Sequence, residues 1–400
     1  MKKLARITEG LIGQPMFGLL SKIKEMERAG SKIIHFEIGD PNFDTPLKVI
    51  EAAKCSLDNK ETHYTDSLGL WDLRQEIRSY TQRTLGFLPD VEQILICPAN
   101  AIIDFVVRCV VNPEEEVIYP DPGFPTYYSV INYAGMAPIG IPLREENAFR
   151  MAPDDILRGI TDKTRLIIIN SPNNPTGSMM TEEEVREAAK IAKERDVYLL
   201  SDEVYSEITY NKTHFSASLY DQCRERTITI NSFSKIYSMS GWRLGYAIGP
   251  APVIKKMGLL LETIISCISP FIQRAGITAL TSCQDLILNR NQELEKRRNA
   301  LIEGLNNIPG IRCLLPEGAF YAFANIKETG LTGKQLMDLL LEKSGVAVLD
   351  GRYFGSYGDG YIRLCYASVP VETIREALAL MKKAIEEYTF NKQRLTGVKR

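Results

Sequence analysis

The segment "TITINSFSKIYSMSGWRLGYAIG", residues 227–249, places one lysine and one arginine between two short apolar runs. The runs at 227–231 and 244–249 are rich in β-branched and aliphatic residues, which is typical of buried β-strands. Lys235 stands among small, hydroxyl and aromatic residues, whereas a surface lysine usually has charged neighbours and a solvated tip. This setting predicts that Lys235 has a specific chemical role.

Runs of the same kind recur between about residues 94 and 250, separated by helical stretches or turns. They include "QILIC" (93–97), "EVIYP" (116–120), "RLIIIN" (165–170) and "VYLLSD" (197–202). Continuous apolar runs without polar alternation indicate strands that are covered on both faces. A capping box from Thr181 to Glu184 begins a helix that would connect the last two runs. The sequence therefore predicts an α/β fold with a mainly parallel sheet wrapped by helices.

The rest of the chain predicts a second, smaller domain, because 400 residues exceed what one core normally supports. Long helices are expected at 251–267 and 270–305, strands at 311–315, 320–326, 346–350 and 361–367, and a final helix at 371–388. The first 45 residues have little periodicity of their own. We expect them to join the C-terminal part.

Bulk composition excludes several classes of function. Lys plus Arg (48) nearly balances Asp plus Glu (50), which gives no electrostatic footprint for nucleic acid or an anionic membrane. The eight cysteines are scattered and several lie in apolar runs, so we expect free thiols and a cytoplasmic protein without a signal peptide. None of the three histidines has a partner at helical spacing, which argues against a metal site and a Ser-His-Asp triad.

Polar residues follow three successive predicted strands, where ligands bind in sheets of this class. Each has an ordinary structural alternative: a turn, a helix cap or a core tyrosine with a satisfied hydroxyl. Their joint occurrence at adjacent strand ends favours a binding site. The residues are Asn174, Asp202, Tyr205, Ser232, Ser234 and Lys235.

These residue types suit one cofactor. A desolvated lysine has a lowered pKa and attacks a carbonyl to form a Schiff base. A carboxylate would keep a pyridine nitrogen protonated, a phenol and an amide would hold a ring oxygen, and hydroxyls with Arg243 would hold a phosphate. The set predicts binding of pyridoxal 5′-phosphate.

The chain resembles the pyridoxal-phosphate-dependent class I/II aminotransferases of fold type I, the aspartate aminotransferase superfamily, nearly from end to end. The motifs, in family order, are "IGDPNFDTP" (38–46), "HYTDSLGLWDLR" (63–74), "YPDPGFPTYY" (119–128), "SPNNPTG" (171–177), "SDEVY" (201–205), "SFSK" (232–235) followed by "GWRLGY" (241–246), and "YIRLCYA" (361–367). The resemblance implies a seven-stranded large domain at 49–295. A small α+β domain would combine residues 1–48 and 296–400.

By this resemblance, Lys235 would form the Schiff base and move the substrate proton, with Asp202 and Tyr205 also catalytic. Asp202 would pair with the ring nitrogen, Tyr205 and Asn174 would hold the ring oxygen, and Phe124 would stack on the ring.

By the same resemblance, separate sets of residues would bind the cofactor phosphate and the substrate. Besides Arg243, the phosphate ligands would be Ser232, Ser234, the turn at Ala99 and Asn100, and Tyr64 from a second subunit. The substrate α-carboxylate would meet Arg363, with help from Asn174 and the Gly39 backbone, and Phe17 would border the substrate entrance.

The resemblance further implies a homodimer that transfers an amino group between a small α-amino acid and a 2-oxo acid. Cis peptide bonds are expected at Asp121-Pro122 and Asn174-Pro175. One motif departs from the family, because Pro98-Ala99-Asn100 replaces a glycine-containing turn. Since proline lacks an amide hydrogen and alanine disfavours positive φ, this part of the phosphate cradle is expected to be altered.

Other readings stay open at this point. A lyase or cyclase acting on an α-amino acid would use the same central residues. Ser232 and Lys235 also fit the S-x-x-K of serine acyl-enzymes, although the supporting S-D-N and K-T-G triplets are absent. A binding module that kept the fold is a third possibility, but none of the central residues is missing.

Overall fold

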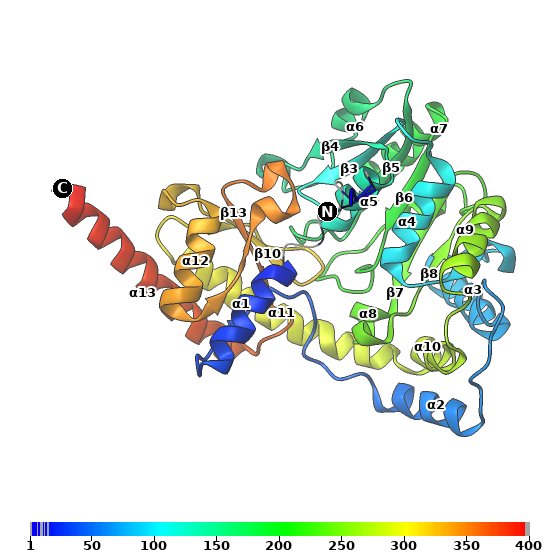
Figure 1. The fold of residues 1–400 in the computed structure, drawn as a ribbon, viewed down its shortest axis with the longest axis horizontal. Helices are drawn as coiled ribbons and strands as arrows, with labels where there is room; N and C mark the ends of the chain where they lie inside the picture. The colour runs from blue at the N-terminus through cyan, green and yellow to red at the C-terminus, as the bar shows by residue number, and fades with distance from the viewer. Residues whose placement is uncertain (1, 6, 9–10, 12, 14–15, 397–400) are drawn as a thin grey trace.

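The computed structural model describes residues 2–5, 7–8, 11, 13 and 16–396, with the side chains of Phe17 and of residues 392–396 outside the description. Its strands form a seven-stranded, a four-stranded and a two-stranded sheet. In Figure 1 the elements around the seven-stranded sheet lie on one side, and those around the four-stranded sheet lie on the other. Helix α11 (Gln284–Asn306) extends between the two groups.

The seven-stranded sheet has the order β2-β8-β7-β6-β5-β3-β4. Neighbouring strands from β4 to β7 pair in parallel, and β8 is antiparallel to both β7 and β2. This sheet confirms the predicted mainly parallel α/β fold. The strands are β2 (Ile94–Ile96), β3 (Glu116–Asp121), β4 (Ala137–Pro142), β5 (Thr164–Asn170), β6 (Tyr198–Asp202), β7 (Thr227–Ser232) and β8 (Gly245–Ile248).

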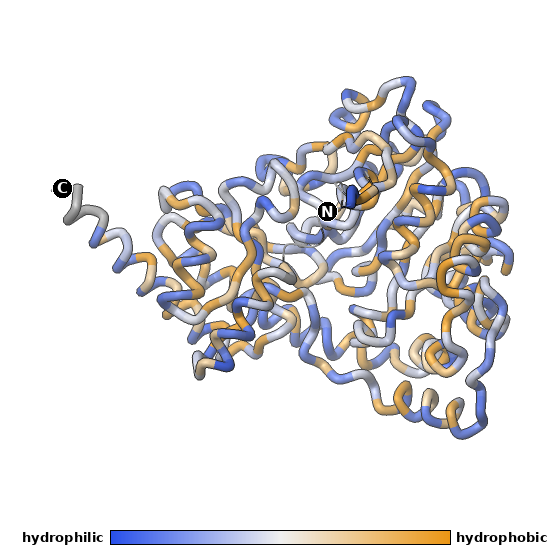
Figure 2. Tube along the Cα trace, in the orientation of Figure 1, coloured by the Kyte–Doolittle hydropathy of each residue, from blue (hydrophilic) through white to orange (hydrophobic). Residues whose placement is uncertain are grey.

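Strand β5 shows why the apolar runs predicted a sheet covered on both faces. Ile167 and Ile169 join the core cluster that contains residues of α7 (Glu182–Glu194), and Leu166 and Ile168 join the one that contains residues of α4 (Ala99–Val110). Successive side chains of a strand point to opposite faces, so an all-apolar strand serves two cores at once. Figure 2 shows hydrophobic residues gathered along the interior elements and hydrophilic residues along the outer loops.

The remaining helices flank these sheets. The predicted capping box at Thr181 is present at the start of α7. The predicted helix at 270–305 is broken at Cys283, whose φ of −122° and ψ of 17° are not helical. The helices not yet located are α1 (Met16–Arg28), α2 (Leu47–Asp58), α3 (Trp71–Leu85), α5 (Pro125–Tyr133), α6 (Pro153–Gly159), α8 (Phe233–Ile236), α9 (Ala251–Ile264), α10 (Pro270–Ser282), α12 (Gly333–Ser344) and α13 (Val371–Thr396).

The four-stranded sheet has the order β12-β13-β10-β9. Its strands are β9 (Arg312–Cys313), β10 (Tyr321–Asn325), β12 (Leu349–Asp350) and β13 (Tyr361–Cys365). Close to it, β1 (Ile34–His35) pairs in parallel with β11 (Val346–Ala347), so the N-terminal segment contacts the C-terminal part of the chain. The domain boundaries at residues 48 and 295 stay a prediction.

All eight cysteines are free thiols, five of them buried: Cys97, Cys223, Cys283, Cys313 and Cys365. Over the described ranges, no helix has the length and apolar character needed to cross a membrane.

The sheet register sets the position of the site. Asn170 at the end of β5 pairs with Asp202 at the end of β6, and Asp202 pairs with Ile230 near the end of β7. Three strands therefore end at nearly the same level, and the residues that follow them meet at one edge of the sheet.

Candidate active site

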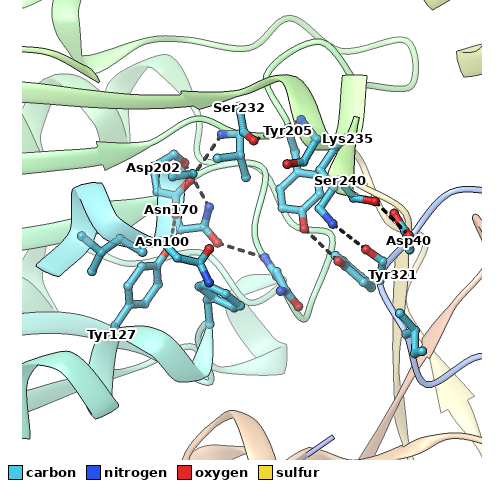
Figure 3. A pocket seen from close by; sticks show the side chains of 18 of the residues that line it. Asp40, Asn100, Tyr127, Asn170, Asp202, Tyr205, Ser232, Lys235, Ser240 and Tyr321 are labelled. Carbon is cyan, nitrogen blue, oxygen red and sulfur yellow. Dashed lines mark hydrogen bonds between the residues drawn. The ribbon is translucent and has the colours of Figure 1, made fainter. Parts of the chain in front are cut away.

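A cavity of about 460 Å³ opens at this edge (Figure 3). Its volume is within the range of sites that hold small molecules, roughly 300–1,000 Å³. The cavity unites residues of the seven-stranded sheet with residues of the N-terminal segment and the four-stranded sheet. The sequence-predicted residues that line it are Gly39, Ala99, Asn100, Phe124, Asn174, Asp202, Tyr205, Ser232, Ser234, Lys235, Arg243 and Arg363.

Lys235 lies on the one-turn helix α8 directly after β7. Ser232 begins this helix, because its Oγ accepts a hydrogen bond from the Ser234 N–H at 3.1 Å. The Lys235 Nζ donates to the carbonyl oxygen of Gly39 at 2.7 Å. Desolvation lowers the pKa of Lys235, and the negative charge of Asp40 opposes this shift. A lowered pKa leaves more of the amine in its nucleophilic, unprotonated form.

Asp202 ends β6 and is buried. Its Oδ2 accepts a hydrogen bond from the Tyr127 hydroxyl at 2.6 Å, and its Oδ1 accepts one from the Val204 N–H at 3.3 Å. Burial raises the pKa of Asp202 to about 6, while both hydrogen bonds oppose the rise. A desolvated carboxylate of this kind is stabilised by a positively charged partner.

Tyr205 follows on the loop after β6, and its hydroxyl lies 2.8 Å from the hydroxyl of Tyr321 on β10. The ring of Tyr205 packs edge-on against Phe320 and Tyr321. Burial raises the pKa of Tyr205 well above its usual range. The residue is therefore a neutral phenol, which can donate its one O–H into the cavity when Tyr321 is the donor of the hydrogen bond between them.

Arg363 on β13 is 1 % exposed. Its Nη1 donates to Asn174 Oδ1 at 3.2 Å, and its Nη2 donates to the carbonyl oxygen of Glu37. The rings of Tyr321 and Phe354 lie 4.6 and 4.8 Å from the guanidinium carbon. The buried Nε has no hydrogen-bond partner, so this arginine keeps unused donors beside the cavity.

Asn174 itself is fixed by Asn170, whose Oδ1 accepts the Asn174 N–H at 3.0 Å. Both cis peptide bonds expected from the sequence are present, at Asp121-Pro122 and Asn174-Pro175, together with a third at Ser171-Pro172.

Hydroxyl, amide and guanidinium groups also line the cavity, from Ser232, Ser234, Asn100 and Arg243. Arg243 donates from Nη1 to the Ser240 carbonyl at 2.7 Å. Helix α4 begins at Ala99 immediately after Pro98, so Ala99 has a helical conformation and needs no positive φ. The positive φ that alanine would disfavour is therefore not required here, whereas Pro98 still has no amide hydrogen to donate to a phosphate. The first amides of a helix have no intrahelical partner and form a common anion site.

Two predicted residues are not seen at the cavity. The Tyr64 side chain is 87 % exposed and lies instead beside Cys267 and Phe271. Phe17 lies in α1, but its side chain is outside the described residues; its neighbour Met16 does line the cavity.

The sequence analysis missed Tyr127, Tyr321 and Asp40, all of which line the cavity. Tyr127 follows Phe124 by three residues at the start of α5, a helical spacing that could have suggested a shared face. Tyr321 gave no such signal, because it reaches Tyr205 through the packing of two distant segments.

Comparisons with known proteins agree with this geometry. The sequence model of the family "Aminotransferase class I and II" matches residues 31–380. The chain is 39% identical to an aspartate aminotransferase of Pyrococcus horikoshii over 373 residues, covering 92% of this chain and 95% of that protein. It is 36% identical to an arginine–pyruvate transaminase of Pseudomonas aeruginosa over 349 residues, covering 87% of this chain and 88% of that protein.

The crystal structure of an aromatic aminotransferase from Pyrococcus horikoshii superimposes with a TM-score of 0.87. It is 36% identical to this chain, and the match covers 92% of this chain and 99% of that one. With a family match over most of its length and relatives well above 30% identity, the chain belongs to the class I and II aminotransferase family.

Proposed function

We propose that the protein is a pyridoxal-phosphate-dependent aminotransferase that moves an amino group between a small α-amino acid and a 2-oxo acid. The observation that carries this proposal is the arrangement of Lys235, Asp202 and Arg363 around one cavity. The relatives named above are all aminotransferases, which favours amino-group transfer over the elimination or cyclisation that the sequence left open.

The donor set fits the cofactor. A desolvated carboxylate at Asp202 suits a protonated ring nitrogen, and a neutral phenol at Tyr205 with the amide of Asn174 suits a ring oxygen. Phe124 borders the same space and can cover a ring face. Groups that would hold the phosphate line the same cavity: Ser232, Ser234, Arg243 and the start of α4 at Ala99 and Asn100.

When bound, pyridoxal phosphate supplies an aldehyde with which amines condense and a pyridinium ring that withdraws electrons from the adjacent carbon. Lys235 would supply the amine that holds the cofactor covalently. Its lowered pKa would leave the Nζ unprotonated and able to accept the proton from the substrate Cα. The Gly39 carbonyl holds Nζ in place until it reacts.

Arg363 is proposed to bind the substrate α-carboxylate. Two of its five N–H groups are taken by Asn174 and Glu37, which leaves three for a ligand. The flanking rings of Tyr321 and Phe354 keep the guanidinium plane fixed and exclude water. A fixed guanidinium would orient the substrate through its carboxylate, and this orientation would decide which Cα bond stands perpendicular to the cofactor ring.

We also propose that two copies share their active sites. Tyr64 is a large aromatic side chain that is almost fully exposed and absent from the cavity of its own chain, which suits a role in a partner's phosphate site. The cytoplasmic location suggested by cysteine usage remains a prediction.

Borohydride reduction tests the cofactor and its lysine. The purified protein should be yellow, and reduction followed by peptide mapping should label Lys235 with the pyridoxyl group. Lys235→Arg should bind the cofactor without a covalent link. A colourless wild-type protein that takes up no added pyridoxal phosphate would refute the proposal.

A further inference from the structure

A short segment, Glu37–Pro41, contacts both Lys235 and Arg363 at the cavity. The Glu37 carbonyl accepts Arg363, and the Gly39 carbonyl accepts Lys235. Ile38, Gly39 and Asp40 line the cavity themselves. The position of this segment therefore bears on both the lysine and the arginine.

Main-chain hydrogen bonds hold the residues on either side of this segment. Phe36 donates to Ala347 and accepts from Cys365, and Asn42 donates to Ala367. Within Glu37–Pro41, which is fully described, the hydrogen bonds involve side chains. Lys235 and Arg363 donate to its carbonyl oxygens. Ser240 donates to the Asp40 carboxylate, and His35 contacts the Glu37 carboxylate. The segment has left the sheet, so side chains decide where its carbonyl groups point.

His35 is the anchor of the Glu37 side chain. Its Nδ1 lies 2.8 Å from Glu37 Oε1, and its Nε2 lies 3.0 Å from Glu27 Oε1 on α1. The Glu37 side chain is fully buried, and its second oxygen has no partner. A buried carboxylate is stabilised by a cation, and His35 is in a position to provide one at Oε1 of Glu37.

The charged groups that face His35 are Glu27 on α1 and Glu37 on its own segment. The paired strand β11 presents the uncharged Ala347, and the Ser368 hydroxyl contacts the carbonyl oxygens of His35 and Cys365 and not the imidazole ring. With a carboxylate on each ring nitrogen, both nitrogens act as donors, which requires the protonated imidazolium.

We infer that His35 is a positioning residue: bridging Glu27 and Glu37, it connects helix α1 to the carbonyl that holds Arg363 and so tunes binding of the substrate carboxylate. Helix α1 begins at Met16, which lines the cavity, so the bridge joins a helix at the cavity wall to the carboxylate site. The inference rests on the proposed role of Arg363.

The bridge matters most when Lys235 reacts, because its hydrogen bond to Gly39 is then given up. The contacts of Glu37 with His35 and Arg363 then hold the N-terminal end of Glu37–Pro41 in place. A loose segment would place the Arg363 fork less well and weaken carboxylate binding, with little effect on the chemistry at Lys235.

Three variants of the holoenzyme test the bridge: His35→Gln, Glu27→Gln and the control Glu25→Gln. Glu25 is an exposed acid on the same helix, so its variant removes the same charge without touching His35. The KM for the 2-oxo acid should rise about three- to tenfold in the first two variants, with kcat nearly unchanged. The control should match the wild type.

Proton NMR gives a readout that is independent of activity. The chain has three histidines, so the His35 signal is the one that His35→Gln lacks. It should titrate near the pKa of about 9 that the two carboxylates give it. The wild-type KM should rise above about pH 9, and that of His35→Gln should not.

Wild-type KM values in both bridge variants would overturn the inference, as would a His35 midpoint near the ordinary histidine pKa of about 6.5. A wild-type protein that binds no cofactor and turns over no substrate would instead refute the proposed function, and the histidine titration would still report on the bridge.

Discussion

Replacing Asp202 by asparagine should make the cofactor-free protein more stable while weakening cofactor binding. Burial raises the pKa of Asp202 from 3.8 to about 6. A carboxylic acid with a raised folded-state pKa binds its proton more tightly when folded, so it destabilises the fold once it ionises. A rise of about two units corresponds to about 3 kcal/mol, fully expressed above about pH 6 and lost below about pH 4.

Urea unfolding of the cofactor-free proteins measures this effect. The stability gained in Asp202→Asn over wild type should grow from about 1 kcal/mol near pH 4.5 to about 3 kcal/mol near pH 7.5. Asp162→Asn makes the same chemical change at an exposed position and should give no pH-dependent difference. Titration with pyridoxal phosphate should show that Asp202→Asn binds the cofactor more weakly than the wild type. A stability difference that is independent of pH, or of the opposite sign, would refute the reasoning.

Three further variants probe single contacts. Tyr127→Phe removes a hydrogen bond to the Asp202 carboxylate, so the pH at which cofactor binding is half lost on acidification should rise by about one unit. Tyr128→Phe, at an exposed position, should leave that pH unchanged, and equal shifts in the two variants would contradict the role given to Tyr127. Arg363→Lys keeps the charge but loses the planar fork, so the KM for α-amino acids should rise about 100-fold with an unchanged cofactor spectrum; loss of cofactor would give this arginine another role. Gly39→Ala places a methyl carbon 2.2 Å from a buried tyrosine hydroxyl, and urea titration should show a loss of about 1–3 kcal/mol.

The sheet could be predicted from sequence because its strands carry local signals. The run 165–170 is apolar on both faces and ends in polar residues, and the strand ends at Asn170 as expected. The break at Cys283 had no such signal, since no glycine or proline interrupts residues 277–290. Helix α10 packs against α2 and α3, whereas α11 packs against α13, β9 and β10, so the break separates two different packing environments.

The reactive residues could be predicted for the same reason. Parallel strands of one sheet end at one edge, so their order in the sequence predicts that Asp202 and Lys235 lie near each other. Their partners could not be predicted in this way. Tyr127 lies 75 positions from Asp202, and Glu37 lies 326 positions from Arg363, so these contacts depend on the register and packing of distant elements.

A single-turnover experiment tests amino-group transfer most directly. The holoenzyme is mixed with one amino acid at a time, from a panel of acidic, basic, aromatic and small neutral side chains, without a 2-oxo acid. Amino-group transfer predicts one equivalent of 2-oxo acid per active site, a matching change in the cofactor spectrum, and then no further reaction until a 2-oxo acid is added. Continued turnover of a single amino acid without added 2-oxo acid would contradict it and identify a lyase or a cyclase.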